Sequence, residues 1–184
     1  MFPRKYIPPR GGWCLLLSVL LPFPSGGGTG SASQTLSAMI TPGAVLSAPG
    51  SATLTHSQTT FQPFQASLAV SYEVRTSPTG SGGKITLQVT KDFSPAEGPS
   101  ATSGVLTYTC AAANLGTPCS GTQTASTTAQ TPLLTVPASA CTGGGGTCSS
   151  QDPNSVNLTF TLTDDPGYST GSYSATVTFT ISAT

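Results

Sequence analysis

The C-terminal part of the chain contains two long stretches in which apolar and polar residues alternate strictly. Residues 156–162 are apolar at even positions, and residues 173–181 are apolar at odd positions, with serine or threonine between them. A period of two gives each stretch one apolar and one hydroxyl-rich face, as in a β-strand. We therefore expect two antiparallel strands joined by a turn at residues 164–167, with their apolar faces covered by another sheet.

The same alternation occurs upstream and predicts an all-β domain. The composition agrees, because helix formers are few while glycine (21) and proline (16) are abundant. Strands are expected at 66–75, 85–89 and 105–110, with edge strands at 122–128 and, between two prolines, at 132–137. The turn-rich residues 77–83 are expected to join the first two as a hairpin. Seven to nine short strands indicate an immunoglobulin-like antiparallel β-sandwich whose core spans residues 66–184.

Residues 33–65 form a polar N-terminal segment in which one or two edge strands are expected, as part of one domain over residues 33–184. Leu36, Ala38 and Ile40 alternate with other residues just before Pro42 and Gly43. Two interpretations stay open for residues 36–40. They form the first strand of the chain's own sandwich, or they add to the sheet edge of a neighbouring molecule.

Residues 1–32 have the pattern of a secretory signal peptide. Arg4, Lys5 and Arg10 give a basic start, residues 13–21 are apolar, and residues 30–32 are small, as at a cleavage site. The apolar run is too short to span a bilayer, which takes about 20 residues. We therefore expect an exported protein, either secreted, at the cell surface or in the periplasm, with no transmembrane segment in the mature chain.

Four cysteines follow the leader: Cys110, Cys119, Cys141 and Cys148. An even number in an exported chain indicates two disulfides in an oxidising compartment. We favour the pairs Cys110–Cys119 and Cys141–Cys148, since each closes a short loop rich in turn formers, and a crossed pairing stays open. Neither pair has the close spacing of a structural zinc motif.

Charge is scarce and argues against a nucleic-acid partner. Beyond the leader only Arg75, Lys84 and Lys91 are basic, against six acidic residues, so this part has a net charge of −3. A nucleic-acid-binding surface requires a basic stripe.

The candidate reactive or ligand-binding residues each have a simpler structural interpretation. His56, the single histidine, has no acid close to it in sequence, which disfavours a catalytic triad. Asp152, Asp164 and Asp165 could bind Ca²⁺ if they met at one end of the final strands, but the same residues are typical of turns. Tyr168 is the one tyrosine expected to be exposed for glycan binding, and Asn157 begins an N-glycosylation pattern. We expect no enzymatic activity and no cofactor.

The closing residues 170–181, with Gly171-Ser172-Tyr173 followed by alternating threonine and apolar residues, resemble the last strand of several bacterial exported sandwiches. These are the spore-coat-U-like proteins, the chaperone–usher pilins and the WxL-type surface domains. The resemblance implies a non-catalytic structural or adhesive protein of a bacterial surface, such as a matrix, coat or fibre subunit. As partners we expect either further copies of this chain or other surface proteins, bound by strand addition. The alternative is an extracellular binding module for glycan or Ca²⁺.

Overall fold

The computed structural model describes residues 33–56, 61–77, 79–141 and 153–183 of the chain. The chain divides into two units, Met1–Ala38 and Met39–Thr184, and all strands of the described residues lie in the second unit. The expected signal peptide, residues 1–32, lies outside the described residues. Within the described residues, no helix has the length and apolar character needed to cross a bilayer.

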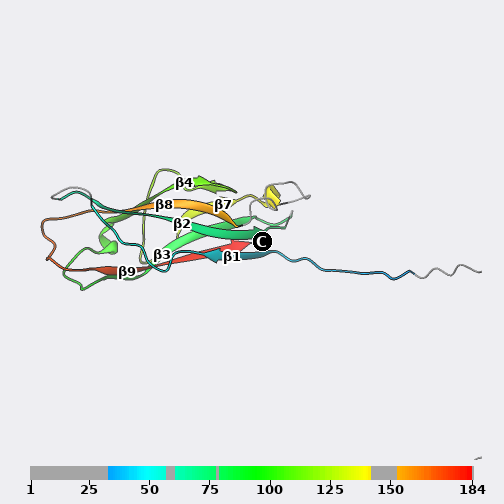
Figure 1. The fold of residues 1–184 in the computed structure, drawn as a ribbon, viewed down its shortest axis with the longest axis horizontal. Helices are drawn as coiled ribbons and strands as arrows, with labels where there is room; N and C mark the ends of the chain where they lie inside the picture. The colour runs from blue at the N-terminus through cyan, green and yellow to red at the C-terminus, as the bar shows by residue number, and fades with distance from the viewer. Residues whose placement is uncertain (1–32, 57–60, 78, 142–152, 184) are drawn as a thin grey trace, which may run out of the picture. The chain divides into compact units, whose positions relative to one another are not determined.

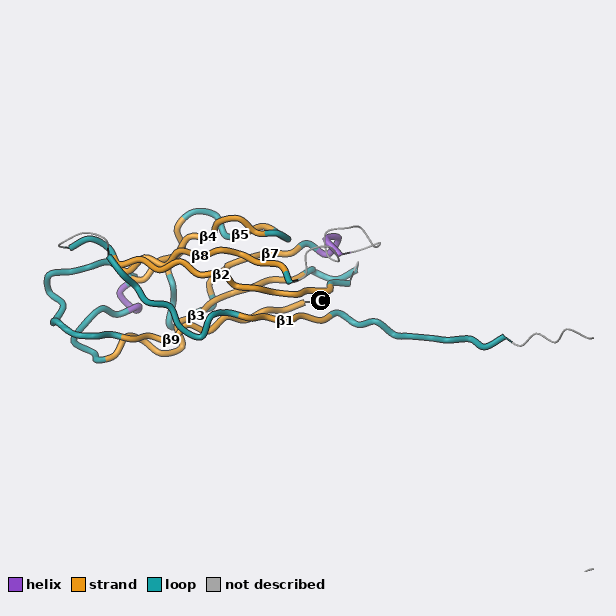
Figure 2. Tube along the Cα trace, viewed as in Figure 1, coloured by secondary structure: helices purple, strands orange, loops and turns teal. Residues whose placement is uncertain are grey.

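The second unit is built from two antiparallel sheets (Figure 1). One sheet has the strand order β1-β2-β8-β4-β6 and the other has the order β5-β7-β3-β9. Strands and loops account for nearly all of the chain in Figure 2, with two short 3-10 turns, η1 and η2. The elements are β1 (Gly43–Ser47), β2 (Phe64–Arg75), β3 (Gly83–Ser94), η1 (Ala101–Ser103), β4 (Leu106–Ala113), β5 (Thr117–Pro118), β6 (Thr122–Thr124), β7 (Thr131–Val136), η2 (Ala138–Cys141), β8 (Asn154–Leu162) and β9 (Ser174–Ala183). The expected all-β class and number of strands are confirmed.

The apolar faces of the two sheets share one core. The alternation seen in the sequence places every second side chain of the central strands inside, where most are almost fully buried. The core includes Val70, Tyr72, Ile85, Leu87, Val89, Leu106, Tyr108, Leu133, Leu134, Val136, Val156, Leu158, Phe160 and Leu162. Each large apolar side chain contributes about 1.5–3 kcal/mol on burial. The two layers are therefore held together by a single continuous apolar interior.

The expectation that the last two long strands pair as a hairpin is wrong. β8 lies between β2 and β4 in the five-stranded sheet, whereas β9 pairs with β3 in the four-stranded sheet. The connection through residues 163–173 passes from one layer to the other (Figure 1). Alternation determines which face of a strand is buried, but it does not determine which strand is its neighbour.

The hairpin expected around residues 77–83 is wrong for the same reason. β2 belongs to the five-stranded sheet and β3 to the four-stranded sheet, so this connection also crosses between layers. A hairpin forms most readily with a loop of two to five residues, and this segment is longer.

The expected edge strand at residues 132–137 is an interior strand in the structure. β7 lies between β5 and β3 in the four-stranded sheet. Pro132 is accommodated because the register between β3 and β7 shifts between Ile85 and Thr86, so the proline stands at an irregularity in the ladder. The weaker edge strand is confirmed in shortened form as β6, at the margin of the five-stranded sheet.

The N-terminal segment does supply an edge strand, but at a different place from the alternating residues 36–40. β1 pairs with β2 at the edge of the five-stranded sheet. Residues 36–40 form no strand, and the side chains of Leu36, Met39 and Ile40 are 88%, 89% and 73% exposed. The interpretation of residues 36–40 as the first strand of the chain's own sandwich is therefore wrong.

Candidate functional site

The acidic residues of the β8–β9 connection form a turn. Asp165 lies on the surface, and its Oδ1 accepts a hydrogen bond of 2.7 Å from the backbone N–H of Gly167. The backbone N–H of Tyr168 donates to the carbonyl of Asp165 at 3.0 Å. This is the geometry by which an aspartate stabilises a turn with its own side chain. The turn interpretation of Asp165 is thus supported by its contacts.

A calcium site is not assembled among the residues that the structure describes. No group of three or more His, Cys, Asp or Glu side chains there is arranged to hold a metal ion. Asp164 is half-buried next to Asp165, and Asp152 lies outside the described residues. Asp164 and Asp165 therefore belong to no metal-binding group in the described part of the chain.

The tyrosines offer no exposed aromatic platform within the described residues. Tyr72 and Tyr108 are buried in the core, as expected. Tyr168 is half-buried rather than exposed, and burial raises the pKa of its phenol, with the charges of Asp165 and Asp164 raising it further. Tyr173 is half-buried and its hydroxyl donates to the carbonyl of Ser169 at 2.6 Å.

His56 lies on the surface beside an aromatic side chain. Its ring meets the ring of Phe64 edge-on, with the centroids 4.8 Å apart. Phe64 begins β2 and packs against the core, so this contact places the histidine at the end of a strand. An edge-on ring contact of this kind contributes to packing.

Asp92 is a structural carboxylate that the sequence alone did not single out. Its Oδ1 accepts hydrogen bonds from the backbone N–H groups of Phe93 and Ala101, at 2.8 and 2.7 Å. Its Oδ2 accepts the hydroxyl of Ser100 at 2.6 Å. Burial acts to raise the pKa of this carboxyl, but the hydrogen bonds outweigh burial and lower the pKa overall. Through these hydrogen bonds the carboxylate links η1 to the end of β3. No residue near Asp92 in the sequence indicates this role.

The disulfide between Cys110 and Cys119 joins the two sheets, and the favoured pairing of these two cysteines is confirmed. Cys110 lies on β4 of the five-stranded sheet, and Cys119 follows directly after β5 of the four-stranded sheet. The backbone N–H of Cys119 donates to the carbonyl of Leu133 on β7 at 2.8 Å. The bond therefore links the two layers covalently. The second expected pair, Cys141–Cys148, lies outside what the structure describes.

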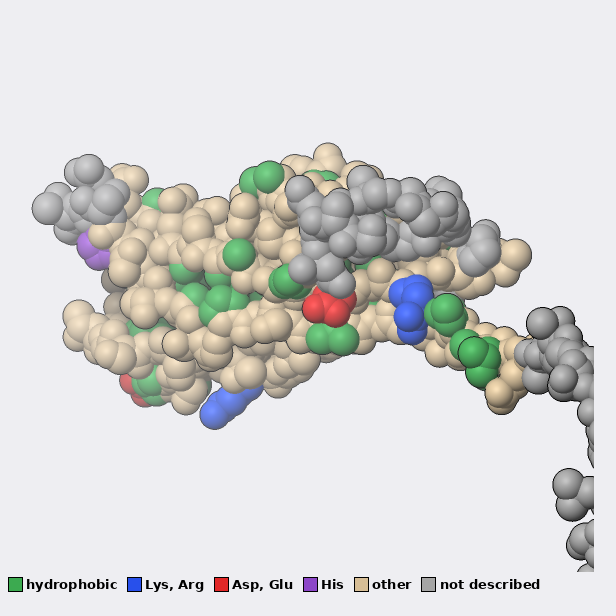
Figure 3. Space-filling view, turned by 45° about the vertical axis from the view of Figure 1, so that its right-hand side comes forward, with side chains coloured by type: hydrophobic (Ala, Val, Ile, Leu, Met, Phe, Trp, Pro, Cys, Tyr) green, Lys and Arg blue, Asp and Glu red, His purple; other side chains and the backbone are tan. Residues whose placement is uncertain are grey.

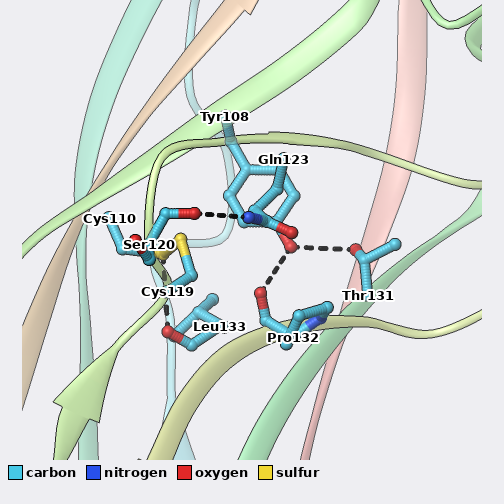
Figure 4. Close-up of a disulfide and its surroundings, with 8 residues drawn as sticks. All are labelled: Tyr108, Cys110, Cys119, Ser120, Gln123, Thr131, Pro132 and Leu133. Carbon is cyan, nitrogen blue, oxygen red and sulfur yellow. Dashed lines mark hydrogen bonds between the residues drawn. A yellow bond between two sulfur atoms is a disulfide. The ribbon is translucent and has the colours of Figure 1, made fainter.

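Figure 4 shows that hydrogen bonds surround this disulfide. The hydroxyl of Tyr108, on β4, lies 2.9 Å from the hydroxyl of Thr131 and donates to the carbonyl of Pro132 at 2.7 Å. The side-chain amide of Gln123, on β6, donates to the carbonyl of Ser120 at 2.7 Å. The contacts of Tyr108 connect β4 with β7, and the contact of Gln123 holds β6 to the segment that follows β5. The region around the disulfide therefore stabilises the fold.

The four sheet edges differ strongly in length. β1 has five residues, β6 has three and β5 has two, whereas β9 has ten. β9 contains no charged residue and no proline. Among the described residues its ladder partner is β3 alone, although β1 lies close to it.

The apolar side chains of β9 are less well covered than those of the central strands. Ala175, Val177, Phe179 and Ile181 all point toward the core and are all half-buried, in contrast to the buried residues of β3 that they face. The exposed residues Leu36, Met39 and Ile40 are a second place where apolar surface is open (Figure 3). These two features are the strongest candidates for contact with another molecule.

Comparisons of the chain with protein-family models, curated proteins and solved structures find no significant match.

Proposed function

We propose that this chain is an exported, non-catalytic structural or adhesive protein of a bacterial surface, with an immunoglobulin-like sandwich as its body and self-association as its mode of action. The observation that carries the proposal is the segment of residues 36–40, which is uncharged and apolar, lies outside both sheets and exposes Leu36, Met39 and Ile40 to solvent. Exposed apolar residues close together in one segment are typical of a surface that binds a partner.

The construction of the body supports a role as a durable module. A disulfide connects the two layers, and the outer faces of the strands carry mainly serine and threonine. Disulfides persist in oxidising compartments, which agrees with the export suggested by the basic and apolar pattern of residues 1–32. The likeness of residues 170–181 to the closing strand of bacterial surface sandwiches supports the bacterial assignment.

The proposal gives residues 36–40 the role of a strand that adds to the sheet edge of a neighbouring molecule. Main-chain hydrogen bonds then supply affinity, and alternate side chains supply specificity. The segment suits this role because Leu36, Ala38 and Ile40 occupy alternate positions and so fall on one face when the segment is extended.

The test is the size and shape of the exported protein, purified from a secretion host, as a function of concentration. Size-exclusion chromatography and negative-stain electron microscopy should show oligomers or fibres that grow with concentration. The double variant Leu36→Asp/Ile40→Asp should stay monomeric, while Ser37→Asp, which adds charge on the opposite face of the same segment, should assemble with only a small loss. A wild-type protein that is monomeric at every concentration would refute the proposal.

A further inference from the structure

We infer that β9 is the edge that receives the added strand, and that the strand comes from residues 36–40 of a second copy of this chain. The inference rests on the proposed self-association and names the partner surface for it. It follows from a comparison of the four sheet edges and from the exposure of the side chains along β9.

Edge length and chemistry single out β9 among the described strands. Natural proteins protect sheet edges by making them short, by placing charges or proline on them, or by bulges. β5 has two residues and contains Pro118, β6 has three residues, and β1 has five and begins with Gly43. β9 has ten residues and carries neither charge nor proline. The register of its ladder with β3 shifts opposite its first residues, 174–176, but is regular from Val177 to Ala183. This regular part is the longest edge without charge, proline or bulge in the described part of the chain.

The backbone of β9 has hydrogen-bonding capacity on the side away from β3. Residues Val177–Ala183 pair regularly with residues 83–89 of β3, and the described ladder has no partner for β9 on the other side. In an edge strand about half of the N–H and C=O groups point away from the sheet and are available to another strand. β1 comes close to β9 but forms its ladder with β2.

The side chains of β9 leave apolar surface for an incoming strand to cover. Val177, Phe179 and Ile181 are half-buried, although their ladder partners Val89, Leu87 and Ile85 on β3 are at most 1% exposed. An added strand beside β9 would place its own inward-facing residues next to this row, about 4.8 Å away in the sheet. The side chains of Val177, Phe179 and Ile181 would then be buried about as completely as those of the central strands.

Residues 36–40 match this edge in chemistry and in period. Leu36, Ala38 and Ile40 recur every two residues, as do Val177, Phe179 and Ile181. Neither segment carries a charge, so no charge is desolvated when the two pair. We favour a second copy over an unrelated partner because each copy presents both the exposed segment 36–40 and the open edge β9. A contact between the segment of one copy and the edge of the next is heterologous, so it repeats from copy to copy.

The test is hydrogen–deuterium exchange of the exported protein, compared between dilute, monomeric samples and concentrated, assembled samples. Outward-pointing amides of β9 should exchange roughly five- to tenfold more slowly on assembly, since each gains a hydrogen bond, and residues 36–40 should also become protected. The amides of β1 and β6 should not change. Leu36→Asp/Ile40→Asp should abolish the protection of β9 at the same concentration, and Ser37→Asp should retain it.

The outcomes separate this inference from the proposal on which it rests. Two results would overturn the inference while self-association stands. One is assembly in which β1, β5 or β6 becomes protected from exchange. The other is protection of β9 that persists in the Leu36→Asp/Ile40→Asp variant. The latter result would indicate that β9 pairs with another β9. A chain that remains monomeric refutes both the inference and the proposed function. The substitutions lie outside the strands and at exposed positions, so the monomer should fold normally.

Discussion

The ring of Tyr173 lies directly against Gly98, so that a Cβ atom at position 98 would overlap the ring. The hydroxyl of Tyr173 donates to the carbonyl of Ser169 at 2.6 Å, which fixes the ring in this place. Gly98 belongs to the connection between β3 and β4, and Tyr173 to the connection between β8 and β9. The contact therefore joins two loops that are distant in the sequence.

Gly98→Ala should consequently destabilise the protein. The ring can make room for the methyl group only by leaving its position and straining its hydrogen bond, and overpacking of this kind costs about 1–3 kcal/mol. Gly50→Ala is the matched control, because a Cβ there meets nothing within 4 Å. Its effect should lie within about 0.5 kcal/mol of zero. Urea unfolding of both variants measures the difference, and equal stabilities would show that the contact is not a constraint.

The disulfide between the sheets gives a second prediction. Its cysteines are nine residues apart in sequence, and closing a loop of this length restricts the unfolded chain by about 2–3 kcal/mol at 25 °C. The double variant Cys110→Ala/Cys119→Ala should lose about this much free energy of unfolding in urea. Both cysteines are replaced together so that no new free thiol is created.

A loss well below about 1 kcal/mol would contradict the role given to this disulfide. The matched comparison is Gln123→Ala, which removes the neighbouring hydrogen bond to Ser120 but leaves the covalent link between the layers intact. That variant should lose only about 0.5–1.5 kcal/mol.

Asp92 gives a prediction about acid stability. Its carboxyl has a lowered pKa in the folded protein because of the hydrogen bonds from Ser100, Ala101 and Phe93, which outweigh the effect of burial. The folded state thus binds this proton less readily than the unfolded state. The stabilisation is present above the ordinary aspartate pKa of about 4 and is lost as the pH falls through the folded value.

The measurement is the free energy of unfolding in urea from neutral pH down to about pH 3. The wild-type protein should lose stability through this range, and Asp92→Asn should show a shallower loss because its side chain does not titrate. Ser100→Ala should fall between the two, since it removes one of the hydrogen bonds that lower the pKa. Identical slopes for all three proteins would show that Asp92 does not contribute to acid sensitivity.

Much of the local structure was predictable because it depends on local pattern. Alternation identified which side chains of β2, β3, β4 and β8 are buried, since the period of a strand is fixed by its backbone geometry. The Cys110–Cys119 pair was predictable because a short, turn-rich loop brings its ends together. In both cases the relevant residues are close in sequence.

Strand partners were not predictable because they depend on contacts between distant segments. Both β2 and β8 were expected to pair with the next long strand, yet each is followed by a crossing to the other layer. Asp92 was also missed, because its partners Ser100 and Ala101 are brought near only when η1 folds against the end of β3. The long open edge of β9 likewise becomes visible only once the strand order is known.

The two core tyrosines give a last prediction, about alkaline stability. Burial raises the pKa of both Tyr72 and Tyr108. The hydroxyl of Tyr72 donates to the carbonyl of Leu115, and the hydroxyl of Tyr108 donates to the carbonyl of Pro132. The folded state therefore retains these protons after the unfolded state has begun to lose them at about pH 10. The stabilisation that these two phenols contribute is fully present below about pH 10 and is lost as the pH rises through their pKa values in the folded protein.

The free energy of unfolding in urea, measured from neutral pH to about pH 11, should fall in the alkaline range. Tyr72→Phe should start about 1–3 kcal/mol lower, because it leaves the carbonyl of the buried Leu115 without this hydrogen bond. Tyr108→Phe should start about 0.5–1.5 kcal/mol lower, because the carbonyl of Pro132 belongs to an exposed residue. Each should then lose less stability between neutral and alkaline pH than the wild-type protein does, since one buried phenol no longer titrates. Alkaline losses equal to that of the wild-type protein would show that these phenols ionise as readily in the folded state as in the unfolded one.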